Sequence, residues 1–231
     1  SVFAQTEPFS IVIEPINIPE LGGLQSFAFG QHDGKWLIVG GRKDGLHRMQ
    51  PFAAFALPGQ NTILTVVDPV SQQKWTAPLT SLAPALQEQL SSTNMNFYQQ
   101  GNYLYCLGGY GYSATFRNHI TYANLTAINV AEVINAIIEN KDFSPFFRQI
   151  SDTKFQVAGG RLKKINDTYY LAGGQKFTGR YNPMGPDHGP GFEQEYTDAI
   201  RKFKIVDDGK QIIITHLASF VDSENLHRRD Y

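Results

Sequence analysis

Three segments of the chain combine cationic and aromatic side chains in a pattern that could bind an acidic ligand. Their candidate ligand-binding residues are Arg42, His47, Arg48, Tyr110, Tyr112, Arg117, His119, Lys176, Arg180 and Tyr181. Arginine binds carboxylates and phosphates through paired hydrogen bonds, and aromatic rings stack on sugars and on guanidinium planes. These segments therefore predict a pocket for an anionic glycan or an acidic peptide. The alternative is that the segments pack on one another, with their arginines bonded to backbone carbonyls of the loops.

No other group of residues in the sequence has the spacing of a common catalytic or metal-binding motif. The six histidines follow neither H-x-x-x-H nor H-E-x-x-H, and G-x-S-x-G does not occur. Cys106 is the single cysteine, so the chain can form no internal disulfide and no thiolate zinc site. Because Cys106 lies among apolar strand residues, we expect a buried, unreactive thiol. We predict no metal site and no cofactor, and we assign no catalytic residue.

A repeat in the sequence indicates how the three segments are positioned. Apolar, β-rich runs at 36–41, 103–109 and 168–174 each end in Gly-Gly, and each follows a tight-turn signal. The second glycine of the pair recurs after 68 and then 65 residues. A unit of that length holds four strands, which is typical of radial arrays of four-stranded sheets. The cationic and aromatic segments directly follow the Gly-Gly pairs.

The pattern resembles the Kelch repeat, in which Gly-Gly ends an apolar strand and an apolar-Asp turn and a Trp come later. The first unit matches best, with Gly40-Gly41, Val67-Asp68 and Trp75, whereas the third lacks the Trp and the second departs most. With 146–150 and 179–183 included, the chain looks like exported bacterial Kelch proteins of the type IX secretion cargo kind. The resemblance implies an all-β fold of Kelch-type β-propeller blades. In such a fold the segments after Gly-Gly join strands two and three and lie on the binding face of the disc.

The repeat also predicts how the chain is divided. We expect one β-propeller domain over 1–231, with 1–5 as a signal-peptide remnant or disordered end, 9–15 as a closing strand, 24–82 as blade 1, 93–150 as blade 2 with a helical insertion at about 130–140, 154–220 as blade 3, and 226–231 as the start of blade 4. The resemblance implies six or seven blades, so about three blades plus a closing strand form only part of a propeller. An incomplete chain, a second chain that supplies the missing blades, and a closed four-bladed propeller are the open explanations.

The composition excludes several classes of protein. Charged residues make up 18% and aromatic residues 13% of the chain, which is typical of neither disordered nor coiled-coil sequences. The net charge of -1 excludes a generic nucleic-acid binder, and no apolar run approaches the roughly 20 residues of a membrane span. Val2 and Ala4 stand at the two specificity positions of a signal-peptidase cut before Gln5. We therefore expect an exported protein that is extracellular, on the cell surface or periplasmic.

Function hypotheses of different classes follow. The first is a non-enzymatic binding scaffold for a protein or glycan partner at the bacterial cell surface or envelope, which is favoured because no catalytic arrangement is evident. The second is a carbohydrate-active enzyme similar to Kelch-type sialic acid epimerases, with a carboxylate held by Arg42, Arg48 or Arg180 and a base at His47 or His119. The third is a cargo or component of a secretion system. Arginines that converge on one pocket favour the enzyme, whereas arginines bonded to loop carbonyls favour the scaffold.

Overall fold

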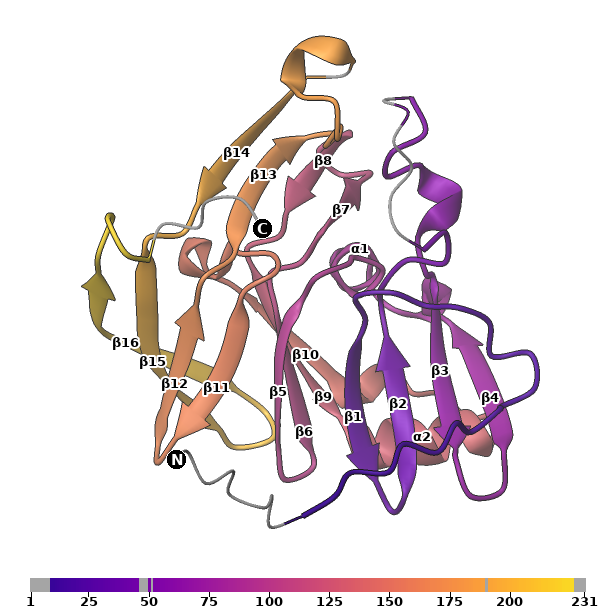
Figure 1. Ribbon diagram of the computed structural model, residues 1–231. Helices are drawn as coiled ribbons and strands as arrows, with labels where there is room; N and C mark the ends of the chain where they lie inside the picture. Colours follow the sequence, from indigo (N-terminus) through magenta and orange to yellow (C-terminus); the bar gives the residue numbers. More distant parts are fainter. Residues whose placement is uncertain (1–8, 46–49, 51, 190, 227–231) are drawn as a thin grey trace, which may run out of the picture.

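The computed structural model describes residues 9–45, 50, 52–189 and 191–226, and it contains three four-stranded antiparallel sheets that stand side by side as blades (Figure 1). Blade 1 consists of β1 (Ala28–His32), β2 (Lys35–Val39), β3 (Ile63–Asp68) and β4 (Gln73–Pro78). Blade 2 consists of β5 (Asn96–Gln100), β6 (Tyr103–Leu107), β9 (Asn124–Asn129) and β10 (Phe147–Ser151). Blade 3 consists of β11 (Arg161–Ile165), β12 (Thr168–Ala172), β15 (Ala199–Asp207) and β16 (Ile212–Val221). The expected fold class, four-stranded antiparallel sheets of the kind found in propeller blades, is confirmed.

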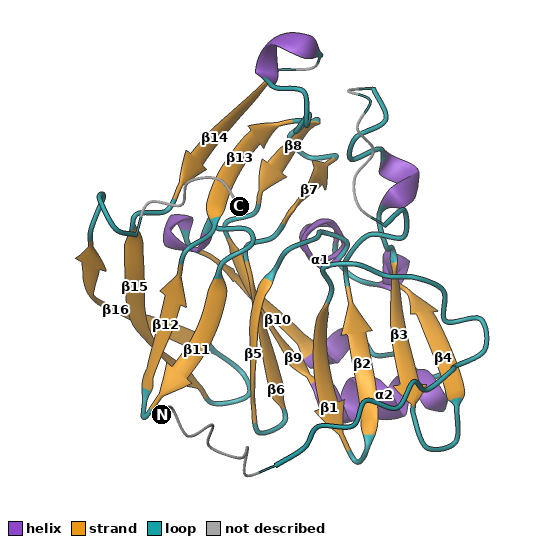
Figure 2. Ribbon diagram, in the orientation of Figure 1, coloured by secondary structure: helices purple, strands orange, loops and turns teal. Residues whose placement is uncertain are grey.

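A fourth sheet lies across the upper edge of blades 2 and 3 (Figure 2). It consists of β7 (Tyr110–Ser113), β8 (Asn118–Thr121), β13 (Gln175–Gly179) and β14 (Phe192–Tyr196). Two α-helices, α1 (Pro84–Leu90) and α2 (Val130–Ile138), connect strands of the blades. Short 3₁₀ turns are η1 (Leu57–Gly59), η2 (Leu79–Ser81), η3 (Ser144–Phe146), η4 (Thr153–Phe155) and η5 (Pro186–His188).

The N-terminal segment differs from the expectation of a closing strand at 9–15. Residues 9–18 form no strand, and the side chains of residues 9–17 are exposed, to 66% at Phe9 and 88% at Ile13. A strand needs a partner edge for its backbone groups, and no described strand pairs with this segment. The signal remnant expected at 1–5 lies outside the described residues. So does the expected start of blade 4 at 226–231, apart from Leu226 in a turn.

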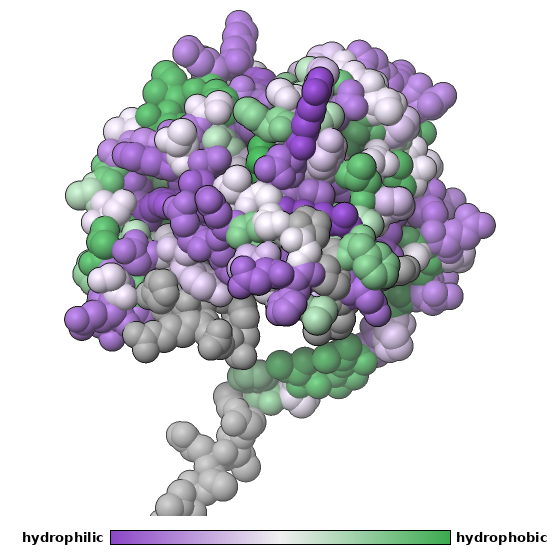
Figure 3. All heavy atoms as spheres, turned by 90° about the horizontal axis from the view of Figure 1, so that it is seen from above, coloured by the Kyte–Doolittle hydropathy of each residue, from purple (hydrophilic) through white to green (hydrophobic). Residues whose placement is uncertain are grey.

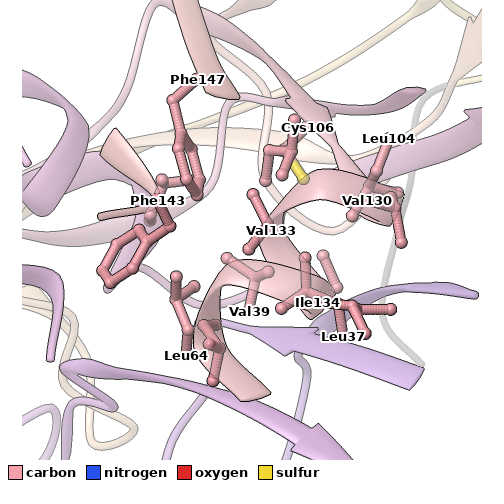
Figure 4. Packing of buried hydrophobic residues seen from close by; sticks show 14 of the residues in the cluster. Leu37, Val39, Leu64, Leu104, Cys106, Val130, Val133, Ile134, Phe143 and Phe147 are labelled. Carbon is pink, nitrogen blue, oxygen red and sulfur yellow. The ribbon is translucent and has the colours of Figure 1, made fainter. Parts of the chain in front are cut away.

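The wedge between blades 1 and 2 is filled by α2 (Figure 4). Val133 and Ile134 of the helix pack among Leu37 of blade 1 and Leu104 of blade 2, all of them buried. The apolar residues of α2 recur at helical spacing, so one face of the helix meets this core. Cys106 is buried in the same cluster, and burial raises the pKa of its thiol to about 12. That thiol therefore stays protonated and unreactive, as expected.

The contact between blades 2 and 3 is aromatic and charged. Tyr169 stacks on Phe203 with 5.7 Å between ring centroids, and it meets Tyr105 edge-on at 6.1 Å. Asp207 of blade 3 accepts a hydrogen bond from the Tyr105 hydroxyl at 3.0 Å and forms an ion pair with Arg148 of blade 2. Burial alone would raise the pKa of the Asp207 carboxyl, but the bond to Arg148 and nearby donors hold it below its usual value. The charged carboxylate thus fixes blade 3 to blade 2.

The Gly-Gly pairs allow the backbones of successive blades to approach closely. The first glycine of each pair has a positive φ, of 68° at Gly40, 63° at Gly108 and 66° at Gly173. A Cβ atom at Gly40 would overlap the carbonyl oxygen of Ser92, and one at Gly108 would overlap that of Val157. The N–H of the second glycine in these two pairs donates to the same carbonyls, at 2.8 and 3.2 Å. At Gly173, a Cβ would meet nothing within 4 Å.

A second set of backbone hydrogen bonds runs along the inner edge of the blades. Ser26, Asn94 and Gly159 occupy equivalent places before the first strand of each blade and have φ values of 55°, 57° and 72°. The N–H of Asn94 donates to the Ser26 carbonyl at 3.0 Å, and the N–H of Gly159 donates to the Asn94 carbonyl at 2.9 Å. Blades 2 and 3 are therefore each bonded to the preceding blade at the same backbone position.

Gly108→Ala is expected to destabilise the fold far more than Gly173→Ala. Both substitutions place a side chain at positive φ, which costs about 1–2 kcal/mol. Gly108→Ala also drives a methyl group into the neighbouring blade, which adds about 1–3 kcal/mol. Urea unfolding of both variants measures the difference. Equal losses of unfolding free energy would show that close blade approach does not depend on the glycine.

Candidate functional site

The three cationic and aromatic segments lie together on one face of the molecule, but two of them are hairpins rather than loops. The β7–β8 hairpin follows the second Gly-Gly pair and the β13–β14 hairpin follows the third. The two hairpins pair with each other through Thr178 and Ile120. Strand pairing satisfies backbone groups that a long loop would leave to water. After the first pair, Ala54 and Phe55 of the segment 52–60 pack against this sheet, and we call the combined surface the hairpin face.

Three of the candidate side chains hold the backbone of one short segment, 52–56. Arg180 donates to two of its carbonyls, at 2.7 and 2.8 Å. His119 bonds to a third carbonyl at 3.0 Å, and Arg42 donates to a fourth at 2.9 Å. The three side chains come from the segments that follow three different Gly-Gly pairs. They therefore form a clamp, in which Arg180 and His119 fix the blade 1 segment to the sheet made by blades 2 and 3 and Arg42 braces the segment from within.

Arg42 is committed further by a second partner. Its Nε and Nη2 donate to the two carboxylate oxygens of Asp44, at 2.8 and 2.6 Å. The guanidinium lies 5.1 Å from the ring centroid of Phe55, close enough for a cation–π contact. The residue is 5% exposed. A buried guanidinium with these partners contributes to the fold and has little surface to offer a ligand.

An aromatic cluster beneath the clamp joins all three segments. Tyr110 and Phe177 are buried, and Tyr181 and Phe192 pack against them. Phe55 meets Tyr110 at 5.1 Å and Tyr181 at 5.7 Å, in both cases edge to face. The Tyr110 hydroxyl donates to a β13 carbonyl and accepts from the Tyr181 N–H, both at 2.8 Å. Burial raises the pKa of Tyr110, so its hydroxyl stays a neutral donor within the cluster.

His119 is a buried, neutral member of the clamp. Its Nε2 lies 3.0 Å from the Phe55 carbonyl oxygen, and since a carbonyl only accepts, Nε2 carries the proton and donates. Burial lowers the pKa of the ring, and the positive charges of Arg180 and Arg42 lower it further. Near neutral pH the imidazole is therefore uncharged and already hydrogen-bonded.

The remaining candidates are spread over the rim of the hairpin face. Arg117 is exposed at the tip of the β7–β8 hairpin. Tyr112 is half-buried, with its ring 5.4 Å from that of His119. Lys176 forms a surface ion pair with Glu195 at 3.2 Å, a contact of small energetic weight. His47 and Arg48 lie outside the described residues.

Sequence reasoning missed two residues that organise this face. Phe55 is the centre of the aromatic cluster, and the charge-free run around it was a usable hydrophobic signal. Glu88 of α1 anchors the β7–β8 turn, because its carboxylate accepts from Ser113 Oγ at 2.5 Å and from the Thr115 N–H at 2.9 Å. Burial opposes this charge, but these hydrogen bonds keep the pKa of Glu88 below its usual value. No local pattern links Glu88 to a turn so far along the chain.

Outside the hairpin face, the described residues form a hollow but no metal-binding cluster. One hollow of about 360 Å³ lies at the inner edge of the blades and includes Asn94, Gly159 and Arg161 in its lining. Among the residues that the structure describes, no three His, Cys, Asp or Glu side chains are grouped to hold a metal ion. Within the same described ranges, no helix has the length and apolar character needed to cross a membrane.

Comparison with known proteins gives a distant likeness in fold. No protein-family model matches the chain, and no curated protein matches it in sequence. Among solved structures, the chain is similar to one described as "Structure of YjhT", with 14% sequence identity and a TM-score of 0.46. The similarity covers 79% of this chain and 54% of that chain, so this chain spans about half the length of that protein.

Arg180→Ala is expected to loosen segment 52–60 without unfolding the blades. The variant loses two hydrogen bonds from a charged donor, together worth about 2 kcal/mol, so local opening becomes roughly 30-fold more frequent. Hydrogen exchange measures the change at the amides of Ala53 and Ala54, which donate to the Gln50 carbonyl, and at those of Gly59 and Gln60, which donate within the segment. Arg117→Ala, at an exposed hairpin tip, is the matched control and leaves exchange unchanged. Unaltered exchange in Arg180→Ala would contradict the clamp.

His119→Gln is expected to flatten the pH dependence of stability on the acid side of neutrality. The pKa of His119 is lower in the folded chain than its unfolded value of about 6.5. As pH falls below about 6.5 the unfolded chain binds a proton that the folded chain does not, so wild-type stability falls by up to about 1.4 kcal/mol per pH unit. Urea unfolding across this range compares the variant with His188→Gln, an exposed control. A slope unchanged by His119→Gln would disprove the assignment.

Proposed function

We propose that this chain belongs to an exported Kelch-type propeller that acts as a binding scaffold for a protein or anionic glycan partner at the bacterial cell surface or envelope. The observation that carries the proposal is the clamp. Arg42, Arg180 and His119 direct their donors to backbone carbonyls of segment 52–56 and not to an open pocket. In the described part of this surface, the candidate base His119 is already bonded to a carbonyl, an arrangement that suits recognition better than catalysis.

The exposed part of the hairpin face has the chemistry of a recognition surface. Phe52 is 78% and Phe116 is 69% exposed, and Arg117 is exposed beside Phe116. Seen from above, polar and hydrophobic side chains are intermixed across this face (Figure 3). An exposed arginine next to aromatic rings can pair with a carboxylate while the rings pack on a sugar or on a peptide. Because Glu88 fixes the β7–β8 turn, little conformational entropy is lost when a partner binds.

Support for the Kelch assignment and for export comes from the sequence. Gly40-Gly41, Val67-Asp68 and Trp75 match the Kelch pattern, and the four-stranded sheets have the expected organisation. The signal-peptidase pattern at Val2 and Ala4, with the wider resemblance to type IX secretion cargo, supports export by an envelope route. A passing contact with the export machinery is compatible with this proposal.

Arg117→Glu is expected to weaken the binding of an anionic partner by at least about tenfold. The change removes a charge-assisted hydrogen bond and adds repulsion, together about 1.5–3 kcal/mol. The measurement is NMR titration of the labelled chain with oligosialic acid and, separately, with oligoglutamate. Wild-type chemical shifts should change within 42–60, 110–121 and 175–196.

Lys210→Glu is the matched control, because Lys210 lies exposed in the β15–β16 turn at the opposite edge of the blade. It should bind as the wild type does. Shift changes confined to the hollow near Arg161, or none with either probe, would count against the hairpin face. Faster interconversion of free sialic acid anomers in proton NMR when the chain is added would replace the scaffold with an enzyme.

A further inference from the structure

A hollow of about 350 Å³ lies between blade 1 and the β7–β8 hairpin, next to α1. Its lining includes Leu79 of η2, Gln87 of α1 and Tyr112 of β7, and we call it the α1 hollow. Helix α1 contacts both η2 and β7, so the walls are held in place together (Figure 1). Small-molecule sites occupy roughly 300–1,000 Å³, so a hollow near the lower end of that range suits a ligand of one ring.

Polar side chains without partners gather at the α1 hollow. Gln60, Thr62 and Thr80 line it, and the amide and the two hydroxyls of these side chains have no hydrogen-bond partner among the described residues. Gln87 lines the same hollow, and its Nε2 donates to the Leu82 carbonyl at 2.6 Å, which leaves its Oε1 without a donor in that part of the chain. The hollow therefore offers both donors and acceptors to a ligand.

Glu88 supplies the charged acceptor of the α1 hollow. Its carboxylate accepts three hydrogen bonds, from Ser113 Oγ at 2.5 Å and from the N–H and Oγ1 of Thr115 at 2.9 and 2.8 Å. An ionised carboxylate has about four acceptor sites, so one remains for a ligand. A single remaining site suits a hydroxyl donor, whereas an ammonium group would need acceptors for three N–H bonds.

The charge of the lining disfavours the anionic ligands expected on the hairpin face. Glu88 is the single charged residue among the described residues that line the α1 hollow, and it repels a carboxylate or a phosphate. A matching ligand is neutral and carries several hydroxyl groups for the amides and hydroxyls of the lining. It also has an apolar face, because Leu79 and Tyr112 belong to the same lining.

We propose that the α1 hollow binds a neutral pyranose, the ring of an uncharged sugar residue. Hydroxyls of the sugar donate to the Glu88 carboxylate and to Gln87 Oε1 and accept from the Gln60 amide, and the C–H face of the ring packs against Tyr112. Internal hydrogen bonds already fix Gln87 and Glu88, so little conformational entropy is lost on binding. The site goes beyond the binding of an anionic partner around Arg117 and does not depend on it.

NMR titration of the labelled chain with methyl glycosides of glucose, galactose, mannose and N-acetylglucosamine tests this proposal. At least one of these sugars should give a saturable change in chemical shift within 60–62, 79–80, 87–91 and 112–114. No saturable change with any of them, or changes confined to other residues, would overturn the proposal. The probes are neutral, so a chain that fails to bind oligosialic acid and oligoglutamate can still bind them, and the two tests fail separately.

Thr62→Arg should raise the dissociation constant of the bound sugar by at least about tenfold, because its long side chain fills part of the α1 hollow. The position tolerates the change, since Thr62 is exposed and its hydroxyl bonds to no described residue. Thr76→Arg is the matched control. It adds the same side chain at an exposed position of β4, outside the lining, and should leave the dissociation constant unchanged.

Tyr112→Leu is the second variant if Thr62→Arg does not fold. It keeps an apolar side chain but removes the aromatic ring, so it should raise the dissociation constant roughly fivefold or more. Circular dichroism and melting curves establish the folding of each variant. Sugar binding that is equally strong in Thr62→Arg and Thr76→Arg, or that is unaffected by Tyr112→Leu, would show that the sugar does not occupy the α1 hollow.

Discussion

The close approach of two backbones at each Gly-Gly pair is the constraint on which the rest of the structure depends. The N–H of the second glycine reaches the carbonyl of the next blade only because the first glycine has no Cβ atom, which would overlap that carbonyl oxygen. That bond sets how near the sheets come, and so it fixes the size of the wedge that side chains must fill. In the first wedge α2 fills the space, and in the second aromatic rings and the Arg148–Asp207 pair do so. The same backbone contact is therefore accompanied by aliphatic packing between blades 1 and 2 and by aromatic and charged packing between blades 2 and 3.

The hairpin face shows how cationic residues can serve structure where their types suggest ligand binding. Four carbonyl oxygens of segment 52–56 accept hydrogen bonds from the arginine and histidine side chains of the clamp. Guanidinium and imidazole groups can cross the gap between segments, which shorter polar side chains cannot do. The clamp thereby keeps the aromatic cluster closed. What remains exposed for recognition is the smaller set around Phe116 and Arg117.

Much of the fold, and less of the candidate site, could be predicted from the sequence. The spacing of Gly41, Gly109 and Gly174 marks the second strand of each blade, because turn chemistry and alternating apolar residues are local signals. The pairing of the two hairpins could not be predicted, because it is not a local signal. The pairing of Thr178 with Ile120 joins two repeats, and no local pattern encodes which hairpin lies beside which. The closing strand expected at 9–15 came from the family resemblance, and no described strand lies beside that segment to pair with it.

Helix α2 gives the order of the blades a specificity that the backbone contacts lack. The helix belongs to blade 2 but packs on the Leu37 and Val39 side of blade 1, where a flat aliphatic surface receives it. The corresponding side of blade 3 carries Lys202 next to Tyr170, which a helix faced with valine and isoleucine cannot cover without burying a charge. The helix therefore specifies which blade can stand next to blade 2. If blades were shuffled or duplicated by recombination, blade 2 would pack only against a preceding blade with an aliphatic surface like that of Leu37 and Val39.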